Sequence, residues 1–294
     1  MRITQGMITE AFMRNLSYNL KNLNDKENML SSGKRIRRPS DDPVSAVLAM
    51  RIRNTLSGIE QYNKNVNDAL TWLENTESAL ANAGDILQRI RELTVNAANG
   101  TLTPQDRQTI LDEVSQLKLQ LLQEANTSYN NRYLFGGYAT DQKPFYIDSS
   151  TGKITANASA AGTFKYNLGM NNDIEVNVLG TDVFKDLFAT VESIEADLQA
   201  NDAAALSSRL ADLDSAIDTV LKYRSQIGAK SNRLDATKTR LDSNEVDYTD
   251  LLSKTEDVDI AKTIMDLKMD ENVYRASLAV GARIIQPTLV DFLR

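Results

Sequence analysis

The sequence predicts a mainly α-helical protein, an elongated antiparallel bundle of long helices in a coiled-coil rod with a small β insert at one tip. Apolar residues follow a 3,4 alternation through most of the 294 residues, which is typical of helices that pair along a narrow seam. Residues 136–180 interrupt that alternation with turn-forming and β-suited stretches. Aromatic residues make up only 6% and there are 5 prolines, so aliphatic helix packing is favoured.

The first and last predicted helices carry matching apolar seams at the two ends of the chain. These seam residues are Met13, Leu16, Leu20, Leu23, Leu30, Ile264, Leu267, Tyr274, Leu278, Ile285 and Phe292. The seams have no internal partner except each other, so we expect the two helices to pair. Exposed apolar edges fray easily, so we expect both ends to be disordered wherever these edges are not covered.

The second and third predicted helices have clear sequence signals. A heptad seam runs from Ile59 to Ala97, at Ile59, Tyr62, Val66, Ala69, Leu73, Thr76, Leu80, Ala83, Leu87, Ile90, Thr94 and Ala97. The third helix covers Ile110 to Leu121, and Thr103, Pro104 and Asp106 provide a cap, a suitable first position and a first-turn acid.

The fourth predicted helix keeps one apolar register from Leu206 to Leu252, about 70 Å at 1.5 Å per residue. Every seventh position between residues 224 and 245 is polar: Arg224, Ser231, Lys238 and Glu245. We therefore expect this helix to pack along one narrow edge. Gly228 lies inside it, and either a close crossing by another segment or a tolerated glycine explains that position.

Between these helices, residues 129–166 hold eight of the 18 aromatic residues. Short β-suited runs at 145–147, 163–166 and 174–178 predict an insert of some 45 residues that leans on the flanking helices. The expected division is 1–42 with 256–294 as a terminal coiled-coil domain, 43–135 with 181–255 as a helical rod domain, and 136–180 as a β insert domain.

The chain has no cysteine and no histidine, which removes Cys/His metal sites, thiol nucleophiles, disulfides and His-dependent catalytic couples. Carboxylate-pair, Ser-Lys and oxygen-ligated cation chemistry remain. We expect that the protein is not an enzyme and that it binds no cofactor or metal. Among the alternatives, catalysis by the insert around Asp148 and Asp173 is least favoured, because no cleft is evident. Acids near residues 256–259 are expected at a helix N-terminus.

No stretch is long and apolar enough for a membrane helix, and the N-terminus lacks the pattern of a cleaved secretory signal. The basic residues Lys34, Arg35, Arg37 and Arg38 can suggest nucleic acid or acidic lipid. The net charge of −7 and the shortness of this cluster favour a charged connector between helices instead. Gly33 is placed for a left-handed helix end, and Asp42 for a helix cap.

Several motifs in one order resemble the bacterial flagellin family. They are 1–4, 30–36, 41–43 and 90–100 near the N-terminus, and 227–234, 256–261 and 286–289 near the C-terminus. The motif residues singled out are Ser31, Ser32, Gly33, Arg35, Ile36, Asp41, Asp42, Pro43, Arg224, Gly228, Ala229, Asn232, Arg233 and Leu234. Segments 38–43, 132–138, 144–145 and 289–293 most resemble the branch of the family that joins the hook to the filament.

The resemblance implies a structural subunit of the bacterial flagellum, exported by a type III route and assembled outside the cell between hook and filament. The implied partners are a hook-associated adaptor subunit, filament flagellin, further copies of the chain in a ring, and a cytosolic export chaperone at the C-terminal helix. Nucleic acid and membrane are not expected partners. The alternatives are a filament flagellin and, in a different class, a coiled-coil signalling module.

Overall fold

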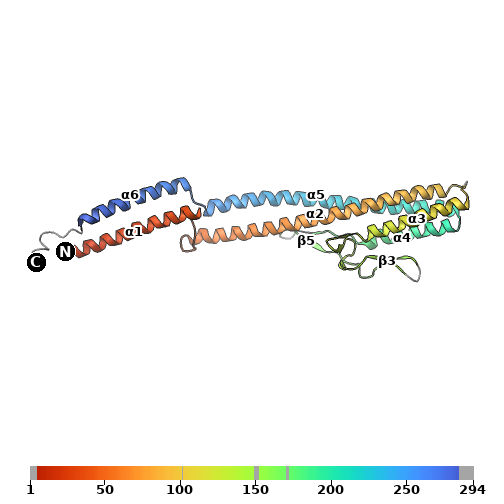
Figure 1. Ribbon diagram of the computed structural model, residues 1–294, viewed down its shortest axis with the longest axis horizontal. Helices are drawn as coiled ribbons and strands as arrows, with labels where there is room; N and C mark the ends of the chain where they lie inside the picture. The colour runs from red at the N-terminus through yellow and green to blue at the C-terminus, as the bar shows by residue number, and fades with distance from the viewer. Residues whose placement is uncertain (1–4, 101, 149–151, 170–171, 285–294) are drawn as a thin grey trace, which may run out of the picture. The chain divides into compact units, whose positions relative to one another are not determined.

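The structure is a computed structural model that describes residues 5–100, 102–148, 152–169 and 172–284. In these residues it contains six helices, α1 (Gln5–Ser32), α2 (Pro43–Ala97), α3 (Pro104–Ala125), α4 (Gly180–Gln199), α5 (Ala203–Glu256) and α6 (Ile260–Ile284) (Figure 1). The chain forms two compact units, one of Met1–Gly58 with Glu245–Arg294 and one of Ile59–Asn244. The predicted helical class with small antiparallel strand pairs is confirmed, whereas the three-part domain division stays a prediction.

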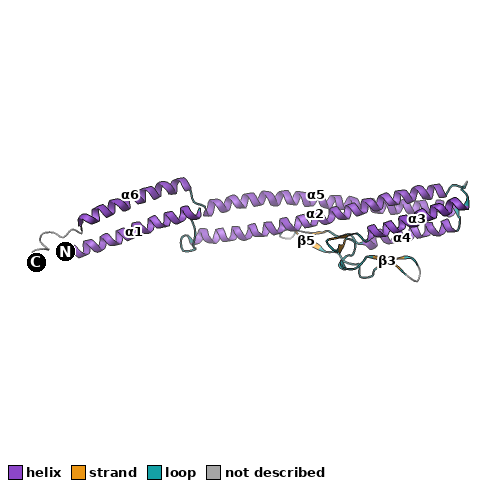
Figure 2. Ribbon diagram, in the orientation of Figure 1, coloured by secondary structure: helices purple, strands orange, loops and turns teal. Residues whose placement is uncertain are grey.

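The strands form three separate antiparallel pairs, all in the second unit (Figure 2). These pairs are β1 (Ser128–Tyr129) with β2 (Arg132–Tyr133), β3 (Phe145–Ile147) with β4 (Ile154–Ala156), and β5 (Lys165–Asn167) with β6 (Asp173–Glu175). The β1–β2 turn has φ of 50° at Asn130 and 63° at Asn131. Asparagine tolerates this left-handed backbone, which matches the twist of a tight hairpin.

The α2 seam forms the core of the second unit. Eleven of the twelve predicted seam residues are buried, and only Tyr62 is half-buried. The buried Thr76 and Thr94 donate their hydroxyl protons to the carbonyls of Trp72 and Ile90, so neither hydroxyl is unpaired. A heptad seam therefore tolerates threonine where its own helix satisfies the hydroxyl.

Helix α5 lies antiparallel to α2 in this unit, with polar pairs beside the apolar seam. Arg91 pairs with Asp214 at 2.6 Å, and Arg224 pairs with Glu77 at 2.7 Å. Leu213, Val220, Ile227, Leu234 and Leu241 of α5 are buried. The polar seventh positions expected from the sequence thus begin at Arg224, which pairs across to α2.

The α3 N-terminus is capped as its sequence predicts. The amide of Asp106 donates to the Thr103 hydroxyl at 3.3 Å, and the amide of Thr103 donates to the Asp106 carboxylate at 3.1 Å. The hydroxyl and backbone amide of Thr103 hold the pKa of Asp106 below its ordinary value of 3.8. This capping box satisfies amides that a helix N-terminus otherwise leaves unpaired.

Helix α4 was missing from the five helices that the sequence predicts. Its buried side chains are Val183, Phe184, Leu187, Phe188, Val191, Ile194 and Leu198. They form a broad stripe with adjacent apolar pairs, and a search for a narrow 3,4 seam does not select such a stripe. A turn with φ of 55° at Asn201 separates α4 from α5, where Asp202 accepts the amides of Ala204 and Ala205.

The position of the β insert is a second correction, because it lies along the flank of the second unit's helices and not at their end. Trp72, within α2, meets Phe164 edge to face at 5.3 Å. Arg233 of α5 donates to Asn172 at 2.7 Å. Phe135, directly before the insert, and Phe145 within it are buried against Phe184 of α4, so aromatic contacts attach the insert to the side of the helices.

Candidate assembly interface

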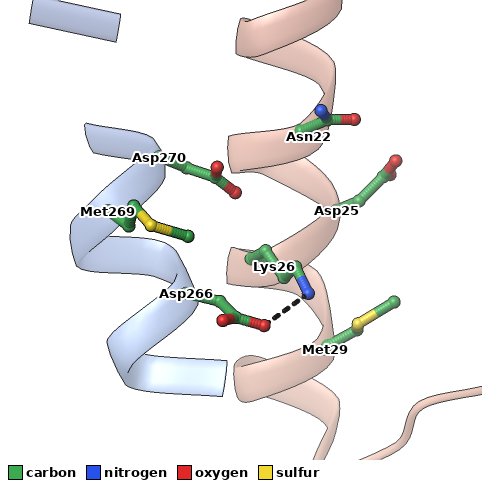
Figure 3. A pocket seen from close by; sticks show the side chains of 7 residues that line it. All are labelled: Asn22, Asp25, Lys26, Met29, Asp266, Met269 and Asp270. Atoms are coloured by element: carbon green, nitrogen blue, oxygen red, sulfur yellow. Dashed lines mark hydrogen bonds and ion pairs between the residues drawn. The ribbon is translucent and has the colours of Figure 1, made fainter. Parts of the chain in front are cut away.

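The terminal helices α1 and α6 pack antiparallel in the first unit. Asn19 donates to the Ser277 hydroxyl at 3.2 Å, and Lys26 donates to the Asp266 carboxylate at 3.1 Å. Figure 3 shows Lys26 reaching Asp266 in a groove of about 450 Å³. The other residues that line this groove are Asn22, Asp25, Met29, Met269 and Asp270. The pairing therefore combines polar contacts with apolar ones.

Close packing at the other end of the pair depends on a glycine. A Cβ at Gly281 of α6 would overlap the ring of Phe12 in α1. Phe12 and Leu16 also line an apolar groove with Val273 and Val280, of about 350 Å³. Gly281 thus lets an aromatic ring approach the α6 backbone.

The α1 face that meets α6 is rotated from the predicted seam. Contacts at Phe12, Asn19 and Lys26 follow a seven-residue spacing, and the intervening Leu16, Leu23 and Leu30 are half-buried. Met13 and Leu20 of the predicted seam are 54% and 50% exposed.

Both terminal helices leave a large apolar surface open. In α6, Leu267 and Tyr274 are half-buried, whereas Ile264 and Leu278 are exposed. Ile285 and Phe292 lie outside the described residues. Further exposed apolar side chains are Met7, Ile8, Tyr18, Met265, Met269, Val273 and Val280. Exposed large apolar side chains are therefore numerous in the described parts of both terminal helices.

The connectors that follow α1 and precede α6 are joined by backbone hydrogen bonds. The amide of Arg35 donates to the Glu256 carbonyl at 2.7 Å, and the amide of Val258 donates to the Gly33 carbonyl at 3.0 Å. Gly33 has φ of 68°, the left-handed conformation expected from the sequence, and it ends α1.

The Glu256 side chain is the charged centre of this junction. Its carboxylate is 6% exposed and accepts from Lys34 at 2.6 Å and from Arg53 of α2. Arg35 donates to the Thr255 carbonyl at 2.9 Å, and Ile36 is buried beside these groups. The residues around 31–36 and 256 therefore form a connector clamp, defined by Gly33, Lys34, Arg35, Arg53 and Glu256.

Asp41 and Asp42 organise the turn into α2. Asp41 accepts the amides of Arg38 and Arg37 at 2.9 and 3.1 Å, and these bonds hold its pKa below 3.8. Asp42 accepts the Ser45 amide at 3.2 Å, and Ser45 lowers the pKa of Asp42 too. Asp42 therefore caps α2, which begins at Pro43, as the sequence predicts.

The remaining motif residues divide into internal and exposed sets. Arg224, Arg233 and Leu234 make contacts within the second unit, as described above. Ser32 donates to the Asn28 carbonyl at 2.8 Å, whereas Ser31, Gly228, Ala229 and Asn232 are exposed. No heavy atom of another described segment lies within 4 Å of a Cβ built at Gly228. A close crossing at Gly228 is therefore not made within the chain.

In the described residues no group of three or more acidic side chains is arranged to hold a metal ion. Glu256 is occupied by two cations, Asp257 accepts the Ser253 hydroxyl at 2.6 Å, and Asp259 accepts the Lys262 amide at 3.0 Å. Asp259 thus caps α6, as helix electrostatics predicts, whereas Glu256 is the last residue of α5, so the expected N-terminal position is wrong for Glu256. Among the described helices, none combines the length and hydropathy that a membrane span needs.

Comparison with known proteins gives consistent matches at both ends of the chain. Residues 3–140 match the bacterial flagellin N-terminal helical region, and residues 210–293 match the bacterial flagellin C-terminal helical region. The flagellar filament 33 kDa core protein of Treponema phagedenis is 30% identical over 272 residues, covering 91% of both chains. Flagellar hook-associated protein 3 of Escherichia coli is 27% identical, covering 94% of this chain and 95% of that protein.

Solved structures share this fold. The crystal structure of Bacillus cereus FlgL is 25% identical with a TM-score of 0.60, covering 69% of this chain and 99% of that one. A hook-associated protein structure from Vibrio parahaemolyticus has a TM-score of 0.63 at 21% identity, covering 74% of this chain and all of that one.

Proposed function

The chain belongs to the bacterial flagellin family and is a structural component of the flagellum, and we propose that it is the subunit that joins the hook to the filament. The observation that carries this proposal is the match to Bacillus cereus FlgL, which extends over 99% of that chain. The E. coli hook-associated relative, matched over 95% of its length, supports the same role. Filament flagellin is the second candidate, because the T. phagedenis core protein is 30% identical.

The proposed role uses surfaces in place of a catalytic site. The open apolar side chains of α1 and α6, such as Met13, Leu20 and Ile264, are available to neighbouring subunits. We propose that copies of the chain form a ring through these helices, with a hook-associated adaptor subunit on one side and filament flagellin on the other. Burial of the apolar surface stabilises such an assembly.

The same surface needs cover before assembly. We propose that the subunit is exported by a type III route to an extracellular position and that a cytosolic chaperone binds α6 beforehand. Residues 1–42 and 256–294 bury few side chains in the described part of the chain, which supports disorder of these ends in the free protein. Rapid protease cleavage of both ends is expected, and protection of residues 1–40 in purified monomer would contradict it.

Deletion of the gene in its native host tests the junction role. We expect the mutant to export flagellin into the medium and to make hooks without filaments, and we expect a plasmid copy to restore filaments. Normal filaments in the mutant would exclude the junction role. Polymerisation of the purified chain into long filaments by itself would favour filament flagellin instead.

A further inference from the structure

A groove in the first unit combines an apolar floor with a basic rim. It has a volume of about 490 Å³ and lies between the connector after α1 and the first turns of α2. Ile36, Ala46 and Met50 contribute apolar surface, while Arg37 and Arg38 contribute guanidinium groups. Ile36 and Ala46 are buried, but Met50 is 56% exposed, so the floor is only partly covered by the chain itself.

The positive charge of this groove exceeds what nearby acids compensate. Glu256 accepts from both Lys34 and Arg53, so one carboxylate faces two cations. Arg37 and Arg38 are exposed, and the described residues form no ion pair with either guanidinium. Asp41 lies close to Arg38, yet its carboxylate is engaged by backbone amides. An anionic partner with apolar side chains therefore complements this groove.

The chain also carries a strip of the opposite character near the end of α5. Residues 241–253 contain four acidic residues and no lysine or arginine. Within this strip Val246 and Leu251 are 69% and 43% exposed, and Asp247 and Asp250 are exposed as well. The strip is thus helical, acidic and apolar on its open surface, and we name residues 241–253 the acidic strip.

We propose that the basic groove receives the acidic strip of a second copy of this chain. This inference rests on the proposed function and names one contact through which the subunits associate. The acidic strip does not line the groove of its own chain, whose α5 contribution is Glu256. Contact between two different surfaces is heterologous, and repetition of such a contact produces a ring or a helix according to the rotation between subunits.

The charge and shape of the groove favour this occupant over nucleic acid. The chain has a net charge of −7, and the exposed apolar side chain of Met50 in the groove would gain little from a phosphate backbone. Val246 and Leu251 supply apolar side chains and Asp247 supplies an exposed carboxylate, while the exposed Asp250 also pairs with Lys254 at 2.6 Å.

Disulfide trapping tests the contact directly, because the chain has no native cysteine. A chain that carries both Met50→Cys and Val246→Cys is expected to give dimers and higher ladders under mild oxidation in assembled flagella. Met50 lies three residues before Arg53 in α2, and Arg53 pairs with Glu256 of α5. Val246 lies ten residues before Glu256, about 15 Å along α5. The Cα atoms of residues 50 and 246 of one chain are therefore too far apart for a disulfide, which needs Cα atoms within about 7 Å.

Two chains serve as matched controls. One carries Met50→Cys alone, and the other carries Met50→Cys with Lys222→Cys. Lys222 is exposed on the α5 part of the second unit. We expect no ladder from either control. Absence of a ladder from the Met50→Cys/Val246→Cys chain in flagella that assemble normally would overturn the contact.

Charge reversal supplies a second test, read by sedimentation of the purified chain at low salt. Arg37→Glu with Arg38→Glu is expected to weaken self-association about tenfold, because like charges then face each other. Asp247→Arg with Asp250→Arg in the mixing partner is expected to restore it. Lys185→Glu with Lys222→Glu gives the same charge change on exposed residues of the second unit and should leave association unchanged.

Complementation of the deletion host separates the two proposals. If the wild-type chain fails to restore filaments, the junction role fails. If the wild type restores them, and the Arg37→Glu/Arg38→Glu chain both restores them equally and self-associates as tightly, only the groove contact is overturned. The groove contact is likewise overturned if the Arg37→Glu/Arg38→Glu change leaves self-association unaffected but abolishes binding of nucleic acid or lipid vesicles.

Discussion

The connector clamp predicts a local effect of replacing Glu256. Glu256→Gln keeps the shape of the side chain and removes the charge that Lys34 and Arg53 share. Removing one partner of a fully buried ion pair costs about 3–5 kcal/mol. Here the two cationic side chains are 42% and 50% exposed and regain water, so we expect a smaller cost of about 1–3 kcal/mol.

Hydrogen exchange at two connector amides, followed in assembled flagella where the ends are expected to be folded, measures this cost where it arises. The amides of Arg35 and Val258 bond across the clamp, so their exchange reports its opening. A loss of about 1.4 kcal/mol accelerates exchange about tenfold. Glu60→Gln, at an exposed position of α2, removes the same charge elsewhere and is the control. Equal exchange at both amides in the Glu256→Gln and Glu60→Gln chains would refute the clamp.

Three further predictions concern packing, a buried ion pair and a helix cap. In assembled flagella, where the two ends are expected to be folded, Gly281→Ala should destabilise the α1–α6 pair by about 1–3 kcal/mol through overlap with Phe12, and Phe12→Ala should relieve it. Thermal melting of isolated flagella followed by circular dichroism checks both, and an unshifted melt contradicts the close approach. Lys118→Met should lower the free energy of unfolding in urea by about 3 kcal/mol, because the carboxylate of Glu195, 12% exposed and 2.5 Å away, then lacks its cation. The additional Glu195→Met change should recover most of the loss. An unchanged free energy of unfolding in the Lys118→Met chain would refute this. Asp106→Asn should lower stability at pH 7, because the folded state holds the pKa of Asp106 below 3.8. The difference from wild type should vanish as the pH falls below the folded pKa. A difference that persists at pH 2 in thermal melts would contradict the cap.

The α2 seam shows what the sequence predicts well. Its residues from Val66 to Ala97 obey one heptad register, and all those named in the seam are buried. A long periodic pattern accumulates many consistent signals, so single polar residues such as Thr76 and Thr94 do not hide it. The same holds for the α3 cap, where Thr103, Pro104 and Asp106 act locally and need no knowledge of distant segments.

Helix α4 and the connector clamp show what such patterns miss. The α4 stripe is broad because it packs against α3 and against Phe145 of the insert, so its apolar pairs do not follow a two-helix seam. Glu256 lies 222 residues after Lys34 and 203 after Arg53, and no spacing rule links them. Lys34 and Glu256 lie in two separate family motifs and Arg53 lies in neither, so their pairing depends on how the connectors fold.

The face of α1 that contacts α6 differs from the predicted apolar seam. An apolar pattern selects Met13 and Leu20, yet α6 is met by Asn19 and Lys26, whose polar contacts carry no hydrophobic signal. Met13 and Leu20 then remain on an open surface, which costs free energy in water and is recovered when apolar surface is buried. The displacement between the apolar seam and the face that packs on α6 therefore leaves part of the seam exposed: polar groups and Phe12 hold α6, and Met13 and Leu20 belong to the open surface that we propose for contact with neighbouring subunits.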